Sequence, residues 1–533
     1  MIRGSNREEM FPLEHAKSIQ KVFLDGHSLT LDELVAVARF GAEVTLTEQA
    51  RAAIRRSRAL AEKIAAEKRV AYGITTGFGD FATVAVPEEM SSRLSTNLVL
   101  SHCTGTGDPY KNEVVRGMML LRANALCVGV SGVRLVLVEK LVELLNAGVT
   151  PVVPQKGSLG ASGDLAPLSH MGLVLMGLGE AEYRGRVVPG AEALRLAGIE
   201  PLDGFASKEG LGITNGTCAM TSVGALNLYD TLRAATLADL VASLSFTALT
   251  GQVNAFQERL HTIRGHEGQV RVAKNFRMLT ENCEILKNAQ GDRVQDAYAL
   301  RCIPQVHGAV RDALAFIKSR VDIELNAVTD NPLLFLEDEA VISGGNFHGE
   351  PMALPFDFLG IACSELASIS ERRTERMVNA ALSNGLTPFL TTEGGVNSGF
   401  MIVQYSAASM VSENKVLAHP ASVDSIPSSA NQEDFVSMGT TAARKSGQIL
   451  ENTLSVLAFE LLTVCQAVDI RRRLNTHGAG LSPVHEAIFR HVRERVAFFE
   501  TDREIWPDIR AVEAMVRSGE LLDLAEDILP ELE

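Results

Sequence analysis

Long apolar patterns of helical period constrain the fold of this chain more than any other feature of its sequence. Apolar residues recur at helical spacing over about residues 217–250, 279–290, 294–326, 353–383, 399–417 and 434–470. Helices of such length bury their apolar faces against one another, and a bundle is the stable arrangement. The central part of the chain is therefore predicted to be a bundle of long helices, with polar clusters in the loops at the helix ends.

The residues before this bundle show shorter and more mixed patterns. Helical spacing covers residues 31–40 and 47–67, the second after a predicted N-cap at Thr45, and then residues 112–145. Residues 183–188 fit a short hairpin. We therefore predict a mainly α fold, with a long-helix bundle core and a smaller mixed N-terminal part. This single continuous fold divides into an N-terminal extension, the mixed part, the central bundle and a C-terminal helical segment, at residues 1–28, 29–216, 217–480 and 481–533.

Composition and charge narrow the class of protein. Hydrophobic residues make up 46% of the 533 residues and aromatic residues 5%, which is typical of proteins that bury a large helical core. The formal net charge of -15 opposes binding to a nucleic acid, because a polyanion has to meet a basic patch. The basic run at residues 471–473 is too short to supply one. The sequence therefore predicts no nucleic-acid partner.

The cysteines, histidines and apolar windows point to a cytoplasmic protein without a metal. Seven cysteines, an odd number with no Cys-x-x-Cys pair, are typical of reduced thiols inside a cell. No histidine pair has the spacing of a zinc site completed by a carboxylate or thiol. The first ten residues lead into no apolar segment of signal-peptide length. Apolar windows such as residues 171–178 are shorter than a membrane span, so no membrane partner is expected.

The stretch Gly157–His170, Gly-Ser-Leu-Gly-Ala-Ser-Gly-Asp-Leu-Ala-Pro-Leu-Ser-His, predicts a tightly bent backbone between two buried elements. It does not fit a phosphate-binding loop, because the Gly-Lys-Ser/Thr ending is missing. Ser162 also lacks the glycine two residues later that a nucleophile elbow requires. An ordinary turn remains one interpretation of these residues.

A chemical interpretation of Ala161-Ser162-Gly163 is also open. If the bend presses the amide nitrogen of Gly163 against the carbonyl carbon of Ala161, ring closure can follow. Loss of water, including the Ser162 hydroxyl, then gives an imidazolone with an exocyclic methylene. Such a ring is an electrophile, which the twenty side chains lack. Glycine offers an unhindered nitrogen, serine a hydroxyl to eliminate and alanine an open carbonyl, while Asp164 and Pro167 are placed to hold the bend.

This stretch resembles the signature of the aromatic amino acid ammonia-lyases, whose prosthetic group is a 4-methylidene-imidazol-5-one (MIO) formed from Ala-Ser-Gly. The resemblance runs from about Tyr72 to about Arg473 through many separate segments, and it is strongest to the histidine-specific members of the family. It implies an MIO group formed from Ala161, Ser162 and Gly163, and no external cofactor.

Two segments before the bend and one after it carry further residues. Tyr72 opens a segment, residues 72–79, that is similar to the family's Tyr-Gly-x-x-Thr-Gly-Phe-Gly, which implies that Tyr72 is the base for the substrate's β-proton. By composition alone, this tyrosine is an ordinary surface residue of an exposed loop. Ser101-His102 resembles the histidine lyases and implies that His102 contacts a substrate imidazole, although a histidine at a helix end also caps carbonyls. Asn215, in an Asn-Gly pair that normally marks a turn, is implied in the MIO pocket.

Three residues near position 300 share one face of a predicted helix. Gln295, Tyr298 and Arg301 lie at spacings of three, so that one face presents all of them, as an ordinary solvated polar face also does. The resemblance implies that Arg301 grips the substrate carboxylate. It also places Tyr298 in the catalytic set and Gln295 in the lining of the same pocket.

Two later segments complete the implied site. Phe347, in a glycine-rich turn, is implied to pack near the MIO ring and the substrate, although it fits a plain core position equally well. Glu433 in Gln432-Glu433-Asp434 is implied to reach the substrate imidazole, and as an alternative it caps the following helix. Phe435 departs from the pattern, because histidine lyases usually carry histidine there. That departure indicates a relaxed or different aromatic substrate.

The implied residues predict an enzyme, a carbon–nitrogen lyase that eliminates ammonia from L-histidine to give trans-urocanate, the first step of histidine degradation. The resemblance further implies a homotetramer whose active sites are shared between subunits. The nearest alternative is a tyrosine or phenylalanine ammonia-lyase, or a 2,3-aminomutase, of the same family. A more distant one is a helical scaffold or binding protein that has kept the fold and lost catalysis.

Overall fold

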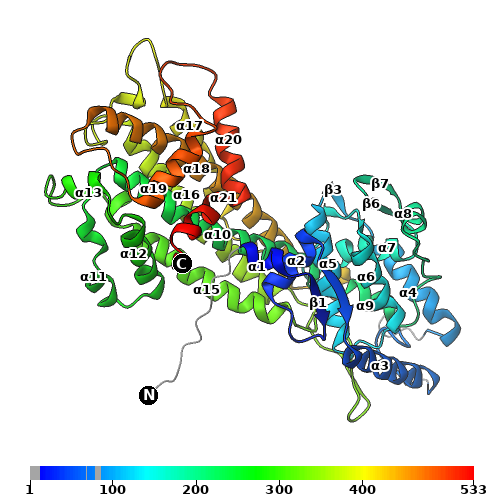
Figure 1. Cartoon of the computed structure of the whole chain (residues 1–533). Coiled ribbons are helices and arrows are strands. Elements are labelled where there is room, and N and C mark those ends of the chain that lie inside the picture. Colours follow the sequence, from blue (N-terminus) through cyan, green and yellow to red (C-terminus); the bar gives the residue numbers. More distant parts are fainter. Residues whose placement is uncertain (1–12, 68, 78–85) are drawn as a thin grey trace. The chain divides into compact units, whose positions relative to one another are not determined.

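The computed structural model describes residues 13–67, 69–77 and 86–533 (Figure 1). It is 60% helical, and the described residues form 21 α-helices with a few short strands. The prediction of a mainly α fold is confirmed. The expectation that the first ten residues contain no signal peptide, and the end of the Tyr72 motif at Phe78 and Gly79, lie outside the described residues.

The chain divides into two compact units, each made of three stretches that are far apart in the sequence. Unit 1 consists of Met1–Leu226, Lys318–Asp357 and Pro420–Arg444, and unit 2 of Asn227–Ile317, Phe358–His419 and Lys445–Glu533. Four helices contain boundaries between these stretches: α10 (Cys218–Ala248), α15 (Ile303–Glu324), α16 (Glu350–Val378) and α18 (Gly439–Leu474). The four segments predicted from the sequence, at residues 1–28, 29–216, 217–480 and 481–533, are each continuous in the chain, and they stay a prediction.

Unit 1 combines short helices with four small sheets. Its helices are α1 (Leu13–Ser18), α2 (Leu31–Phe40), α3 (Glu48–Ala66), α4 (Glu88–His102), α5 (Asn112–Cys127), α6 (Leu135–Ala147), α7 (Leu165–Leu175), α8 (Gly190–Ala197) and α9 (Glu209–Thr214). One sheet is parallel and pairs β1 (Lys21–Leu24) with β2 (Glu43–Leu46). Two antiparallel pairs are β3 (Thr106–Pro109) with β5 (Pro154–Lys156), and β8 (Leu333–Phe335) with β9 (Ala340–Ile342). The last sheet is antiparallel and has three strands in the order β4 (Val149–Pro151), β6 (Glu180–Tyr183) and β7 (Arg186–Pro189). The predicted hairpin is β6–β7.

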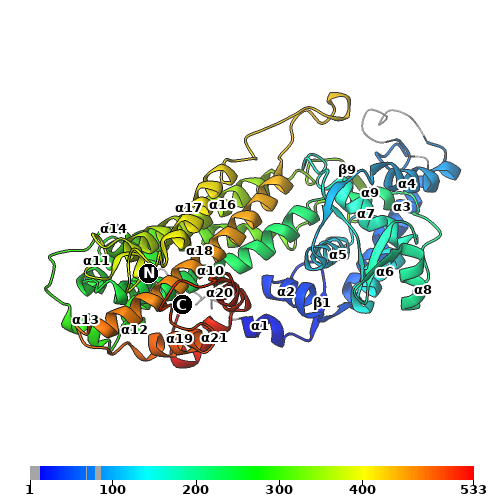
Figure 2. The same cartoon turned by 90° about the horizontal axis from the view of Figure 1, so that it is seen from above.

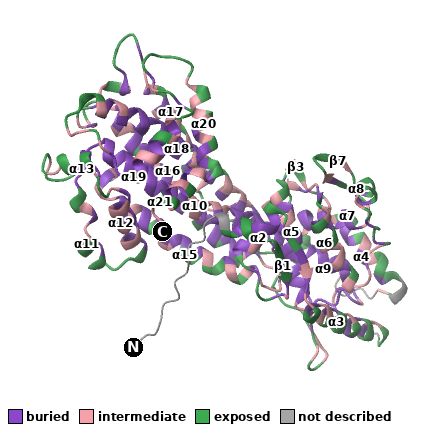
Figure 3. Cartoon of the chain, in the orientation of Figure 1, coloured by how far each residue is buried: buried purple, intermediate pink, exposed green. Residues whose placement is uncertain are grey.

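Unit 2 is a helical bundle around the long helices. Ala234 of α10, Cys363 of α16 and Ile449 and Leu450 of α18 form one buried cluster. Buried residues run along the long helices in Figure 3, and α16, α17 and α18 lie side by side in Figures 1 and 2. The remaining helices of this unit are α11 (Glu258–Thr262), α12 (Glu267–Leu279), α13 (Glu284–Asn288), α14 (Tyr298–Arg301), α17 (Met401–Leu417), α19 (Pro483–Arg493), α20 (Trp506–Ser518) and α21 (Glu520–Ile528).

Several predicted element boundaries were wrong. The N-cap of α3 is Thr47, whose hydroxyl accepts a hydrogen bond from the Ala50 amide, and not Thr45 in strand β2. Residues 279–290 contain only the five-residue α13, whereas α12 before them was missed. Residues 294–297 are not helical, so Gln295 precedes α14 instead of sharing a helix face with Tyr298 and Arg301. Short loops rich in Ala and Leu carry the same apolar spacing as helices, and tertiary packing decides between them.

Two helices, α16 and α18, are long and apolar enough to cross a membrane by length and composition. Their 18-residue windows have mean hydropathies of 1.4 and 1.6. The expectation that the longest apolar windows are shorter than a membrane span was therefore wrong for these helices. Within the structure, 67% and 89% of the two windows are buried, and burial in the bundle core accounts for their apolar composition.

A buried ion pair joins three long helices in unit 2. The Arg373 guanidinium of α16 lies 2.6 Å from the Glu460 carboxylate of α18, and both side chains are fully buried. The Glu460 carboxylate also accepts hydrogen bonds from Ser245 of α10 at 2.6 Å and from Ser370 of α16 at 2.5 Å. The carboxylate is thus satisfied by partners that only the assembled bundle provides.

Replacing Arg373 by Met would leave the Glu460 carboxylate buried without its cation. We expect the free energy of unfolding, measured by chemical denaturation, to fall by about 3–5 kcal/mol. Arg490→Met is the matched control, because the Arg490 side chain is 74% exposed and its pair with Glu486 contributes at most about 1 kcal/mol. Equal losses in the two variants would contradict this account of the bundle core.

Candidate active site

The Gly157–His170 stretch is bent against a second turn at Gly216. Gly163 has φ +75°, and its backbone pairs with Gly216 in a parallel bridge. The Asp164 amide donates to the Gly216 carbonyl at 2.7 Å, and the Gly216 amide donates to the Ser162 carbonyl at 3.4 Å. A Cβ atom on Gly163 would lie 2.1 Å from the Gly216 carbonyl oxygen, so that this contact requires glycine.

The Asp164 carboxylate anchors the bend from behind. It is fully buried and accepts hydrogen bonds from the Ala219 and Met220 amides, each at 2.9 Å, at the start of α10. Its other oxygen accepts from the Ser158 hydroxyl at 2.8 Å and from the Thr440 hydroxyl. Burial holds the pKa of Asp164 above its ordinary value, although these hydrogen bonds act to lower it. The predicted role of Asp164 in holding the bend therefore has a geometric basis.

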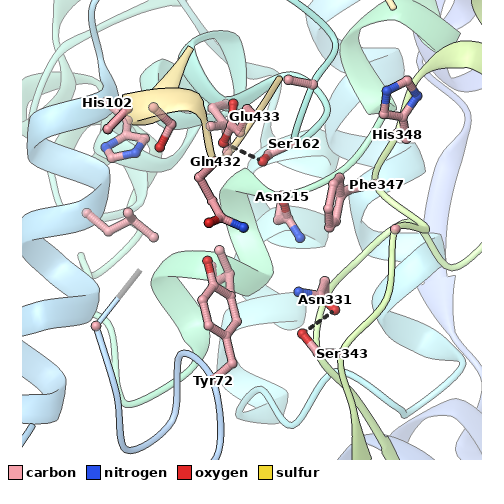
Figure 4. A pocket seen from close by; sticks show the side chains of 18 of the residues that line it. Tyr72, His102, Ser162, Asn215, Asn331, Ser343, Phe347, His348, Gln432 and Glu433 are labelled. Carbon is pink, nitrogen blue, oxygen red and sulfur yellow. Dashed lines mark hydrogen bonds between the residues drawn. The ribbon is translucent and has the colours of Figure 1, made fainter. Parts of the chain in front are cut away.

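A cavity of about 1640 Å³ opens over the bend, entirely within unit 1. Its described walls come from separate parts of the chain: Tyr72, Gly77 and Val86, and residues within 94–102, 161–165, 211–215, 331–348 and 429–435. Figure 4 shows Tyr72, His102, Ser162 and Glu433 facing this common space. The fold thus collects residues that are hundreds of positions apart in the sequence.

Asn215 connects the second turn to the bend. One orientation of the Asn215 side-chain amide gives both its nitrogen and its oxygen a hydrogen-bond partner. In this orientation the nitrogen donates to the Ser162 carbonyl at 2.9 Å. The side-chain oxygen accepts from the Asn331 amide at 3.1 Å. The Asn215 carbonyl accepts from the buried guanidinium of Arg122. Asn215 therefore has a fixed position at the floor of the cavity.

His102 is the last residue of α4 and lies half-buried at the cavity wall. Its Nδ1 atom is 2.9 Å from the Ser101 hydroxyl. Burial lowers the pKa of His102, while the Leu98 carbonyl and the Glu433 charge act to raise it. The ring is accordingly a neutral imidazole held by local partners and facing a carboxylate.

Glu433 reaches the bend itself. Its carboxylate accepts a hydrogen bond from the Ser162 hydroxyl at 2.8 Å and one from the Ser428 hydroxyl at 3.3 Å. The alternative prediction that Glu433 caps the following helix was wrong, because α18 begins at Gly439 and the carboxylate is bound elsewhere. The loop around it is bent sharply, with positive φ at Ser429, Ala430 and Asn431.

The cavity brings together most, but not all, of the predicted site residues. Its lining includes Tyr72, His102, Ala161, Ser162, Asn215, Phe347 and Glu433, and Gly163 lies buried beside it. Gln295, Tyr298 and Arg301 belong to unit 2 and are not among the lining residues. Gln295 and Tyr298 are exposed, and the Arg301 guanidinium lies over the Tyr298 ring at 4.7 Å.

Sequence reasoning missed other lining residues. Asn331 is buried, and its side-chain oxygen accepts from the Gly344 amide at 2.7 Å and from the Ser343 hydroxyl at 3.2 Å. His348 lies beside Phe347 at the cavity wall. The polar Asp-Asn-Pro sequence at residues 330–332 is the only signal that marks Asn331 in advance. In the described part of the chain, no group of three or more His, Cys, Asp or Glu residues is arranged to hold a metal ion.

Comparison with known proteins identifies the family. The family model for aromatic amino acid lyase matches residues 29–494. The chain belongs to the aromatic amino acid lyase family. It is 54% identical to a histidine ammonia-lyase of Caldanaerobacter subterraneus subsp. tengcongensis, over 96% of this chain and 99% of that protein. It is 50% identical to histidine ammonia-lyase 1 of Fusobacterium nucleatum subsp. nucleatum, over 97% and 99% of the two chains.

Solved structures of this lyase family share the fold. The crystal structure of histidine ammonia-lyase from Trypanosoma cruzi superposes with a TM-score of 0.88 at 40% identity and covers 96% of both chains. The tyrosine aminomutase from Streptomyces globisporus gives a TM-score of 0.90 at 38% identity, over 95% of this chain and 98% of that chain. The fold is therefore common to relatives that are named for different substrates.

The residue at which this lyase departs from the expected histidine pattern lies at the edge of the cavity. Phe435 is 62% exposed, and its ring stacks on His348 with the centroids 6.1 Å apart. The Phe435 carbonyl accepts a hydrogen bond from His348 Nε2 at 3.1 Å, and His348 Nδ1 accepts from the Glu350 amide at 3.3 Å. The Phe435 ring thus packs on His348, and Glu433, two residues earlier, still contacts Ser162.

The contact between Gly163 and Gly216 can be tested by adding one methyl group. We expect Gly163→Ala to lower the melting temperature, because its Cβ atom would meet a backbone carbonyl. Gly148→Ala is the control, since Gly148 has φ +71° but nothing within 4 Å of an added Cβ atom, so that only about 1–2 kcal/mol of left-handed strain is added. Similar melting temperatures for the two variants would contradict the predicted clash.

Proposed function

We propose that this lyase eliminates ammonia from L-histidine and releases trans-urocanate, the first step of histidine degradation. The observation that carries this proposal is the presence of His102 and Glu433 in the wall of one cavity, next to the Ser162 bend. An imidazole and a carboxylate suit an imidazole ring and would be poorly solvated beside a phenyl ring. Curated relatives named histidine ammonia-lyase, 50–54% identical over nearly the whole chain, support the same substrate.

We also propose that Ala161, Ser162 and Gly163 condense into the MIO group. The residues fit it: the Ser162 hydroxyl faces the cavity, the Gly163 position excludes a side chain, and Asn215 holds the Ser162 carbonyl. The group would supply an electrophile that activates the substrate for loss of its amine. No external cofactor is needed for this chemistry.

Tyr72 is the proposed base. It lines the cavity from the loop after α3, and its hydroxyl points into the space between His102 and Asn215 in Figure 4. A base has to lie within hydrogen-bond reach of the proton that it removes, and the shared cavity lets a bound substrate contact both Tyr72 and the bend. Phe347, on the opposite wall, supplies an apolar surface for the substrate ring.

Gln295, Tyr298 and Arg301 are proposed to act from a neighbouring subunit. They belong to unit 2 and are not among the residues that line the cavity of unit 1, yet the site still needs a cation for the substrate carboxylate. A guanidinium binds a carboxylate with two parallel hydrogen bonds, which suits Arg301. We therefore propose a homotetramer with shared active sites. We further propose that it works in the cytoplasm, where its seven free cysteines stay reduced.

The reaction is tested by incubating the protein separately with histidine, tyrosine and phenylalanine and separating the products by chromatography. We expect urocanate from histidine. The exposed Phe435 ring favours a second candidate, a tyrosine or phenylalanine ammonia-lyase or a 2,3-aminomutase. Cinnamate-type or β-amino products, with histidine unchanged, would establish that candidate instead.

The ring is tested by intact mass. We expect the mature chain to be lighter than its sequence by two water molecules. The Ser162→Ala variant cannot form the exocyclic methylene, so it should lose activity while its helical circular dichroism is unchanged. A wild-type chain of full mass that still binds amino acids would favour a scaffold or binding protein.

The role of Glu433 in substrate choice is tested by Glu433→Leu. Loss of a charge-assisted hydrogen bond costs about 1.5–3 kcal/mol, so that kcat/KM for histidine should fall about 10- to 150-fold. Asp434→Leu, at the next position in the same cavity wall, serves as control and should cost much less. Equal kcat/KM values for the wild type and Glu433→Leu would remove Glu433 from the substrate site.

A further inference from the structure

The partners of His102 decide which of its ring nitrogens carries hydrogen. The Ser101 hydroxyl donates to the Leu98 carbonyl at 3.1 Å and lies 2.9 Å from His102 Nδ1. A hydroxyl has a single proton to give, and when Ser101 gives it to the Leu98 carbonyl, its oxygen accepts from Nδ1. The Leu98 carbonyl, which can only accept, also acts on the ring as a hydrogen-bond partner. We adopt this arrangement of the neutral ring, in which Nδ1 carries the hydrogen and Nε2 presents a lone pair.

Glu433 is a second acceptor in the same cavity. Its two carboxylate oxygens receive hydrogen bonds from the Ser162 and Ser428 hydroxyls, and the Ser162 hydroxyl is lost when the proposed MIO group forms, so that acceptor capacity remains among the about four lone-pair sites of the carboxylate. Both groups line one cavity, so that one ligand can meet both, and the Glu433 charge acts to raise the pKa of His102 against the larger effect of burial. Glu433 is the charged group in the described residues that acts on the His102 ring.

We propose that this cavity binds the substrate's imidazole ring as the imidazolium cation, with one ring N–H donated to His102 Nε2 and the other to Glu433. A neutral imidazole has one N–H and one lone pair, and its lone pair would be left facing an acceptor, which is unfavourable. The cation donates twice and is balanced by the Glu433 charge. This inference rests on the proposed function, because it requires a substrate with an imidazole ring.

The charge on the ring has a chemical consequence. The proton is taken from solvent when the ring binds and returns to solvent when the product leaves, so that the overall reaction is unchanged. While bound, the cationic ring withdraws electrons from the adjacent β-carbon. The β-proton becomes more acidic, which lowers the demand on Tyr72 as a base. His102 and Glu433 would then assist the elimination as well as select the substrate.

Proton uptake on binding tests the proposal directly. The probe is 3-(imidazol-4-yl)propanoate, which has no amine to lose, titrated into the full-length protein at pH 8.5 in buffers of different ionisation enthalpy. The histidine side chain has a pKa of about 6.5, and the probe, which lacks the α-ammonium group, is up to about one unit more basic, so the free ring is at most about one-tenth protonated at this pH and binding should take up between about 0.5 and 0.9 proton per ligand. The 1,2,3-triazol-4-yl analogue has nearly the same shape but is much less basic. It should bind more weakly and take up almost no proton.

Variants locate the acceptors. Glu433→Gln removes the charge and His102→Gln supplies an amide that can donate to a neutral ring, so each should reduce proton uptake by at least about half. Asp434→Asn removes a neighbouring charge and should leave the uptake unchanged. Full uptake in the Glu433 or His102 variant would contradict the proposal.

Two other results would overturn it. Binding of the imidazole ligand without proton uptake would show a neutral ring, and equal uptake with the triazole would show that the protein gains the proton. Histidine conversion, measured on the same preparation, distinguishes a failure of the ring-charge proposal from a failure of the proposed function. A protein that converts histidine but takes up no proton contradicts the ring charge alone, whereas a protein that leaves histidine unchanged contradicts the proposed function.

Discussion

The buried contact between the bend at Gly163 and the turn at Gly216 is the constraint on which this site depends. Two backbone hydrogen bonds join the segments, and neither position leaves room for a side chain. Asp164 then ties the bend to the first turn of α10 and to Thr440 in the first turn of α18. The geometry that would favour condensation of three residues is thus imposed by elements that are distant in the sequence, since a free loop of this composition would sample many bends.

The charges around the bend follow from the same arrangement. Glu433 lies in a loop of the last stretch of unit 1, residues 420–444, and its carboxylate accepts a hydrogen bond from Ser162, while His102 lies at the end of α4. Burial lowers the pKa of His102, and the Ser101 hydroxyl and the Leu98 carbonyl are its local partners. An imidazole ligand would therefore meet two acceptors, and a phenyl or phenol ring would leave them without a donor. Discrimination between substrates in a shared fold rests on such small differences in donors and acceptors.

The sequence predicted the fold well where one physical period dominates. Long apolar patterns gave α10, α16, α17 and α18 with small boundary errors, because helices that run through a core carry apolar residues over many turns. It failed where local competition is close: α12 was missed, and Gln295 was placed on a helix that begins only at Tyr298. The sequence analysis also expected apolar windows shorter than a membrane span, whereas α16 and α18 contain longer ones, because both helices run through the bundle core.

By itself, the sequence determined the helical class, the aromatic amino acid lyase family and the residue types of the bend, because periodicity and the Ala-Ser-Gly signature are written along the chain. Only the tertiary structure decided that Tyr72, His102, Ser162 and Glu433 share one cavity, that Asn331 supports Asn215, and that the Gln295–Arg301 segment does not line it. The physical reason is that the first set depends on local composition, whereas the second depends on long-range packing, which brings together segments separated by hundreds of residues.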